Sequence, residues 1–122
     1  MAPMPADLSQ TRVVVAVFAM HGCGPCEEFL PRFTAHVERF QRTGYPFVIL
    51  RPGAKLKPGQ IPVMIYNAAA EDSELQAFAD RLGVAATPTT AMMTRRGVTK
   101  LEGSLEDAQI DQLLYAAAQA NR

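Results

Sequence analysis

The sequence has no tryptophan, only two cysteines and two histidines, and no net charge. Its 12 basic and 12 acidic residues cancel, which gives no electrostatic reason to expect binding to nucleic acid or to an anionic membrane. No run of about 18 apolar residues occurs, so we expect no transmembrane helix. Residues 1–12 lack the basic start and the apolar stretch of a signal peptide, and a cytoplasmic protein is therefore expected.

The length and composition fit an ordinary globular protein. The 122 residues are 48% hydrophobic and 20% charged, and they contain no internal repeat. A chain of this length builds one hydrophobic core, so we predict a single domain over residues 1–122. A monomer is the default expectation.

The two cysteines, Cys23 and Cys26, stand three positions apart. A structural disulfide normally closes a longer loop, because a short loop restricts the unfolded chain less. In a cytoplasmic protein this spacing indicates redox chemistry or part of a metal site. Inert buried thiols and a zinc site that adds His21 and His36 are the alternatives. His36 is expected on a helix about 15 Å along the axis from Cys26, which argues against zinc and favours a solvated histidine.

The pattern of apolar residues predicts alternating strands and helices. Strands are predicted over Val13–Ala19, Tyr45–Leu50, Ile61–Tyr66, Thr89–Thr94 and Val98–Leu101. Helices are predicted from about Cys26 to Thr43, from Ser73 to Gly83, and after Ser104. The first strand is apolar throughout, which is typical of a strand covered on both faces.

Local signals mark the ends of these elements. Ser73 with Gln76 and Ser104 with Asp107 have the spacing of capping boxes at helix starts. Residues 51–60 hold two prolines and two glycines, which predicts a loop. The order of elements predicts an α/β fold with a mixed central sheet and helices on both faces.

The cysteine pair falls where the first predicted strand passes into a helix. Free N–H groups and a partial positive charge at a helix N-terminus stabilise a thiolate, so the pKa of Cys23 is expected below ~8.5. Gly24 and Pro25 let the chain turn tightly and bring the Cys26 sulfur within bonding range. The predicted chemistry is attack by the Cys23 thiolate on a substrate disulfide, resolution by Cys26, and regeneration by an external reductant.

The segment Cys23-Gly24-Pro25-Cys26 is the active-site tetrapeptide of thioredoxins, and the sequence resembles that family. Pro31 matches the family's helix-kinking proline, and residues 83–89 resemble its segment from glycine to cis-proline. The resemblance implies a thioredoxin-like fold and the reduction of protein disulfides. It also implies disulfide-bearing protein substrates, a reductase as electron donor, and no cofactor besides the redox-active disulfide.

The resemblance further assigns roles to residues outside the tetrapeptide. It implies a cis bond between Thr87 and Pro88, with Pro88 against the two sulfurs. It implies a substrate groove that includes Gly22, Thr87 and Gly103, with Thr87 offering backbone hydrogen bonds to a bound peptide. The alternative is a binding module or adaptor that docks on a partner protein through this surface, with redox activity incidental.

Four positions depart from the family pattern. Gly22 stands where thioredoxins carry tryptophan, and Val17 stands where they carry a buried aspartate that helps move the proton of the second cysteine. His21 and Glu27 are the nearest groups that can replace that acid. Glu27 and Glu28 also bring negative charge near the thiolate, so Cys23 is expected to be less acidic than in typical thioredoxins.

The family's first strand and helix have no counterpart in this sequence. Only twelve residues precede Val13, and residues 45–60 form an insertion relative to the family. We predict that Tyr45–Leu50 supplies a replacement strand at the edge of the sheet.

Overall fold

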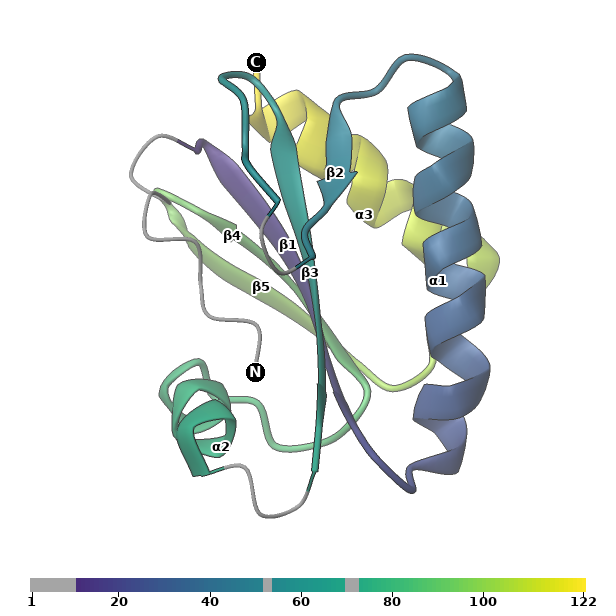
Figure 1. Ribbon diagram of the computed structural model, residues 1–122, viewed down its shortest axis with the longest axis vertical. Helices are drawn as coiled ribbons and strands as arrows, with labels where there is room; N and C mark the ends of the chain where they lie inside the picture. Colours follow the sequence, from purple (N-terminus) through teal and green to yellow (C-terminus); the bar gives the residue numbers. More distant parts are fainter. Residues whose placement is uncertain (1–10, 52–53, 70–72) are drawn as a thin grey trace.

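The computed structural model describes residues 11–51, 54–69 and 73–122 and contains a five-stranded mixed sheet (Figure 1). Along the chain the elements are β1 (Val13–Met20), α1 (Gly24–Arg42), β2 (Phe47–Ile49), β3 (Ile61–Ala68), α2 (Ser73–Arg81), β4 (Thr89–Thr94), β5 (Gly97–Glu102) and α3 (Asp107–Ala120). The strand order is β2-β3-β1-β4-β5. Helices α1 and α3 cover one face and α2 covers the other, which confirms the predicted fold class. In the described ranges no helix is long and apolar enough to cross a membrane.

Strand β1 is the centre of the sheet. It pairs in parallel with β3 and antiparallel with β4. Successive side chains of a strand point to opposite faces. Val13, Val15 and Val17 therefore join the core under α1 and α3. Phe18, with Val14 and Ala16, joins the second core on the face that α2 covers. This two-sided burial confirms the prediction from the uniform apolar run.

Strand β2 lies at the edge of the sheet and pairs in parallel with β3. It is shorter than the predicted range Tyr45–Leu50, but the flanking residues continue the pairing. Ile61 N–H donates to the Pro46 carbonyl at 2.8 Å, and Leu50 N–H donates to the Val63 carbonyl at 3.0 Å. The predicted edge strand is confirmed. Within the predicted loop 51–60, residues 52–53 lie outside the described part of the chain.

Helix α1 begins at Gly24, two residues earlier than predicted. Pro25 is favourable there because the first turn of a helix needs no hydrogen bond from its nitrogen. Its buried apolar stripe contacts the core through Phe29, Phe33, Val37 and Phe40, as the spacing predicted. Pro31 lies inside the helix and is exposed. The helix thus brings Cys23 and Cys26 to one end of the sheet.

The predicted capping box at the start of α3 is wrong. Helix α3 has Glu106 as its N-cap, and Gln109 closes the box. Ser104 instead donates to Glu28 Oε2 at 2.7 Å, and the Asp107 carboxylate accepts from Arg32 at 2.9 Å. Both predicted capping residues therefore serve the contact between α3 and α1.

The second predicted capping box, at α2, is also not formed as expected. Ser73 is already the first residue of the helix, and Gln76 Nε2 donates to Asp80 Oδ1 at 3.0 Å. Residues 70–72, which precede the helix, and the side chain of Leu75 lie outside the described structure.

The prediction of a solvated His36 is wrong. Its side chain lies between α1 and α3 and is buried, with 8% relative exposure. Nδ1 is 2.7 Å from Asp111 Oδ1, and Nε2 is 3.1 Å from Asp107 Oδ1. Both ring nitrogens are thus occupied by carboxylates of α3. A shared zinc ion with the cysteine pair is incompatible with these contacts.

Candidate active site

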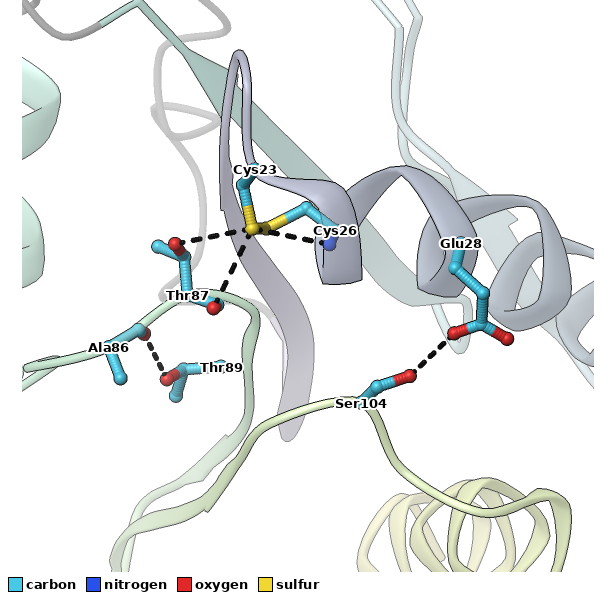
Figure 2. Close-up of a disulfide and its surroundings, with 7 residues drawn as sticks. All are labelled: Cys23, Cys26, Glu28, Ala86, Thr87, Thr89 and Ser104. Atoms are coloured by element: carbon cyan, nitrogen blue, oxygen red, sulfur yellow. Dashed lines mark hydrogen bonds between the residues drawn. A yellow bond between two sulfur atoms is a disulfide. The ribbon is translucent and has the colours of Figure 1, made fainter.

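Cys23 and Cys26 form a disulfide at the N-terminus of α1 (Figure 2). Cys23 is the N-cap residue with extended backbone angles, φ −88° and ψ 108°. Its sulfur accepts a hydrogen bond from the Cys26 backbone N–H at 3.2 Å. Cys26 is buried, with 1% exposure, whereas Cys23 is half-buried. Cys23 is thus the more exposed of the two cysteines.

The segment that precedes β4 lies against the Cys23 sulfur. The bond between Thr87 and Pro88 is cis, and Pro88 is buried. Thr87 Oγ1 donates to Cys23 Sγ at 3.7 Å, and the Thr87 carbonyl oxygen is also 3.7 Å from that sulfur (Figure 2). The resemblance suggested only backbone hydrogen bonds from Thr87. The sequence did not lead us to predict the contact between the Thr87 hydroxyl and Cys23, although the threonine before Pro88 could have indicated it.

Gly103, in the loop after β5, lies next to the cis-proline segment that contacts Cys23. Its N–H donates to the Pro88 carbonyl at 2.8 Å, and its φ is +87°. Gly22, which is exposed beside Cys23, has a φ of +80°. Both angles lie in the left-handed region, which disfavours any residue with a Cβ. A Cβ at residue 22 would meet open space, so it is the backbone angle that disfavours a side chain there.

A polar network links the other side of the site to α3. Glu28 accepts hydrogen bonds from Ser104 and from Arg32, whose Nε is 2.8 Å from Glu28 Oε1. Figure 2 shows the Glu28 side chain directed toward Ser104. The hydrogen bond from Arg32, assisted by the one from Ser104, lowers the pKa of the Glu28 carboxyl. The ion pair with Arg32 thus partly neutralises the negative charge of Glu28. The repulsion between Glu28 and a Cys23 thiolate is therefore weaker.

Sequence reasoning did not identify this network. Glu28 and Arg32 are four residues apart on α1, a spacing typical of helical ion pairs. The ion pair between Glu28 and Arg32 could therefore have been predicted from the sequence. The partners Ser104 and Asp107 come from more than 70 positions away, since the contacts span 72 and 75 residues.

The two predicted modulators do not touch the sulfurs. His21 and Glu27 are exposed, and within the described ranges the side-chain contact to Cys23 Sγ comes from Thr87. Val17 is fully buried in the core, so no carboxylate occupies the position of the family aspartate. Roles for His21 and Glu27 stay predictions. Among the described residues, no group of three or more His, Cys, Asp and Glu side chains is arranged to hold a metal ion.

The arrangement as a whole suits thiol–disulfide exchange. A reachable sulfur caps a helix, a buried sulfur lies one turn further on, and a cis-proline segment contacts the first sulfur. Together with the mixed sheet, this site defines a thiol–disulfide oxidoreductase of thioredoxin-like fold.

Comparison with known proteins agrees with this class. The family model described as "Thioredoxin-like domain" matches residues 6–118, and the chain belongs to this family. A search of curated protein sequences found no significant match.

Solved thioredoxin structures have the same fold at low sequence identity. Thioredoxin from Fasciola hepatica superposes with a TM-score of 0.59 at 14% identity, over 89% of this chain and 85% of that chain. The oxidised thioredoxin of Plasmodium falciparum gives 0.59 at 17% identity, over 91% and 86% of the two chains. Thioredoxin f from spinach chloroplast gives 0.53 at 19% identity, over 92% and 79%. At these identities the likeness shows the fold alone.

Proposed function

We propose that this protein reduces disulfide bonds in other proteins, with Cys23 as the attacking residue and Cys26 as the resolving residue. The observation that carries the proposal is the unequal exposure of the two cysteines. Cys23 is half-buried at the helix N-cap, whereas Cys26 is 1% exposed. This difference supports Cys23 as the residue that meets a disulfide on another polypeptide.

The reaction starts from the dithiol. The Cys23 thiolate attacks one sulfur of the substrate disulfide, forms a mixed disulfide and releases the other substrate sulfur as a thiolate. Cys26 then loses its proton and attacks the Cys23 sulfur. The Cys23–Cys26 disulfide forms, and the second substrate sulfur leaves as a thiolate. Two electrons have passed from the protein to the substrate, and a separate reductase is needed to return them.

Three features of the site support the first step. The Cys26 N–H at 3.2 Å and the Thr87 hydroxyl at 3.7 Å both donate to the Cys23 sulfur, and hydrogen bonds of this kind favour a thiolate. The helix N-terminus adds its partial positive charge. The ion pair between Glu28 and Arg32 moderates the opposing charge of Glu28.

Insulin reduction by dithiothreitol tests the proposal. Wild-type protein is expected to accelerate the precipitation of the insulin B chain, and Cys23→Ser is expected to show the rate of dithiothreitol alone. Equal rates for the two proteins would contradict the proposal. They would favour the alternative, a docking module whose partner binding survives Cys23→Ser.

A further inference from the structure

The hydroxyl of Ser104 joins the loop after β5 to helix α1. It donates to Glu28 Oε2 at 2.7 Å and accepts from Arg32 Nη2 at 2.9 Å. Its proton and one of its lone pairs are therefore both used by side chains of α1. Helix α3, which follows the loop, does not need this hydroxyl, because Glu106 is its N-cap. The role of the Ser104 side chain therefore lies in the contact with α1.

Arg32 fixes the geometry of this contact. Its guanidinium donates to Glu28 through Nε at 2.8 Å and through Nη2 at 3.3 Å, and its Nη1 donates to Asp107 Oδ1 at 2.9 Å. A single exposed ion pair contributes little, because water competes for it and two flexible side chains must be ordered. A planar guanidinium that holds two carboxylates and a hydroxyl at once specifies orientation as well as charge. Ser104 is therefore held at a defined position relative to α1.

The residue before Ser104 carries the connection to the redox pair. Gly103 N–H donates to the Pro88 carbonyl at 2.8 Å. Thr87, which precedes Pro88, directs its hydroxyl to Cys23 Sγ at 3.7 Å (Figure 2). Because a hydrogen bond weakens steeply as its geometry is lost, a small movement of residues 87–88 changes this contact.

These contacts form a closed path around the redox site. One half runs along the first turns of α1, from Cys23 at the N-cap to Glu28. The other half runs from Ser104 through the backbone of residue 103 to residues 87–88 and back to the Cys23 sulfur. Figure 2 shows the link between Ser104 and Glu28. Both residues of this link are exposed, so it can be removed without disturbing the core.

We propose that Ser104 is a positioning residue for the reaction of Cys23: by joining the loop after β5 to α1, it keeps the Thr87 hydroxyl in contact with the Cys23 sulfur. The inference deepens the proposed function and rests on it, since it concerns the reactivity of the same sulfur. Ser104→Ala changes no charge at the site, and Glu28 keeps its ion pair with Arg32. An effect of this substitution on Cys23 therefore reports on the position of residues 87–88 and not on charge repulsion.

The direction of the effect follows from the two contacts that Thr87 makes. Its hydroxyl stabilises the thiolate of Cys23, whereas its carbonyl oxygen, also 3.7 Å from the sulfur, accepts only from the protonated thiol. Both contacts weaken when residues 87–88 move. A hydrogen bond to a charged sulfur is the stronger of the two, so the net result is a less stable thiolate.

The rate of iodoacetamide alkylation of the reduced protein against pH, with the modified residue identified by peptide mapping, tests the proposal. Ser104→Ala is expected to raise the apparent pKa of Cys23 by about half a unit, which lowers the thiolate fraction at pH ~6 about threefold. Ser104→Thr keeps a hydroxyl and is expected to return the profile toward that of the wild type. The matched control Ser73→Ala, at the exposed start of α2, is expected to leave the profile unchanged. A wild-type profile for Ser104→Ala would overturn the inference.

A double-mutant cycle tests whether the effect passes through Thr87. In a Thr87→Val background the hydroxyl is absent, so Ser104→Ala is expected to add almost no further shift. The same shift in both backgrounds would overturn the proposed coupling.

Insulin reduction, measured in parallel, separates this inference from the proposed function. Wild-type protein that does not reduce insulin, while the alkylation profiles shift as expected, would contradict the proposed function alone. Wild-type protein that reduces insulin, with Ser104→Ala showing the wild-type alkylation profile, would contradict the role of Ser104 alone.

Discussion

The hydroxyl of Thr87 donates to the sulfur of Cys23 at 3.7 Å, across 64 positions of sequence. The carbonyl oxygen of the same residue lies equally far from that sulfur. In the reduced protein these two groups act in opposite directions. The hydroxyl stabilises the thiolate, whereas the carbonyl can accept a hydrogen bond only from the protonated thiol. Residue 87 is therefore expected to influence the reactivity of Cys23, and its place in a peptide groove stays a prediction.

Thr87→Val removes the hydroxyl and keeps the shape and the carbonyl. We expect the pKa of Cys23 to rise by about one unit, because a hydrogen bond to a charged group is worth about 1.5 kcal/mol and one pKa unit is 1.36 kcal/mol. The rate of iodoacetamide alkylation against pH measures this shift. Thr87→Ser, which restores a hydroxyl, is expected to return the profile toward that of the wild type. Identical profiles for the wild type and Thr87→Val would rule out a role for the hydroxyl.

The same alkylation profile tests the effect of the acidic residues after the motif. The wild-type pKa of Cys23 is expected to be higher than in typical thioredoxins because of Glu27 and Glu28. An apparent pKa well below 6.5 would contradict that expectation. It would mean that Arg32, paired with Glu28, offsets the acidic charge more fully than predicted.

Arg32 makes the contact between α1 and α3 sensitive to acid. Hydrogen bonds from Arg32, with smaller contributions from Ser104 and His36, lower the pKa values of Glu28 and Asp107 from their usual 4.5 and 3.8. A carboxyl with a lowered folded-state pKa stabilises the fold above its unfolded pKa, and the stabilisation is lost as the pH falls through the folded pKa.

We therefore expect Arg32→Met to unfold more easily than the wild type at pH 7, with a difference that shrinks below pH ~4.5 and vanishes near pH 2. Urea unfolding at low ionic strength, repeated across this range, measures the difference. Arg95→Met, in the turn between β4 and β5, serves as the control and is expected to show no such pH dependence. A gap between Arg32→Met and the wild type that stays constant with pH would show that Arg32 acts through packing alone.

His36 is expected to contribute more to stability than its polar character suggests. Its ring is 8% exposed and contacts Asp107 and Asp111 of α3. His36→Ala leaves both carboxylates without this partner, so we expect a loss of about 2 kcal/mol in the free energy of unfolding. His21→Ala, at an exposed position, is expected to change it by less than about 0.5 kcal/mol. Equal effects of the two substitutions, measured by urea unfolding, would contradict the structural role of His36.

Contiguous signals in the sequence predicted the main parts of the site. The cysteine pair, the turn into α1 and the segment before Pro88 are each encoded within a few residues. The strand β1 was predictable because its apolar run is unbroken. The existence of the edge strand β2 was predictable, but its bounds were not, because the strand has only three residues.

Contacts across long sequence distances were not predictable. The spacing of His36 on α1 does not reveal that Asp107 and Asp111 meet it from α3, 71 and 75 positions away. Asp107 was misread as a capping residue for the same reason.

The unequal roles of the two cysteines are tested most directly by trapping the mixed disulfide. Reduced Cys26→Ser protein, mixed with a peptide disulfide at pH 7, is expected to accumulate a stable adduct of one peptide on Cys23, seen by intact-mass spectrometry and peptide mapping. Cys23→Ser is expected to accumulate little adduct over the same time, because Cys26 is only 1% exposed. Adducts that form on Cys26 as fast as on Cys23 would contradict the account.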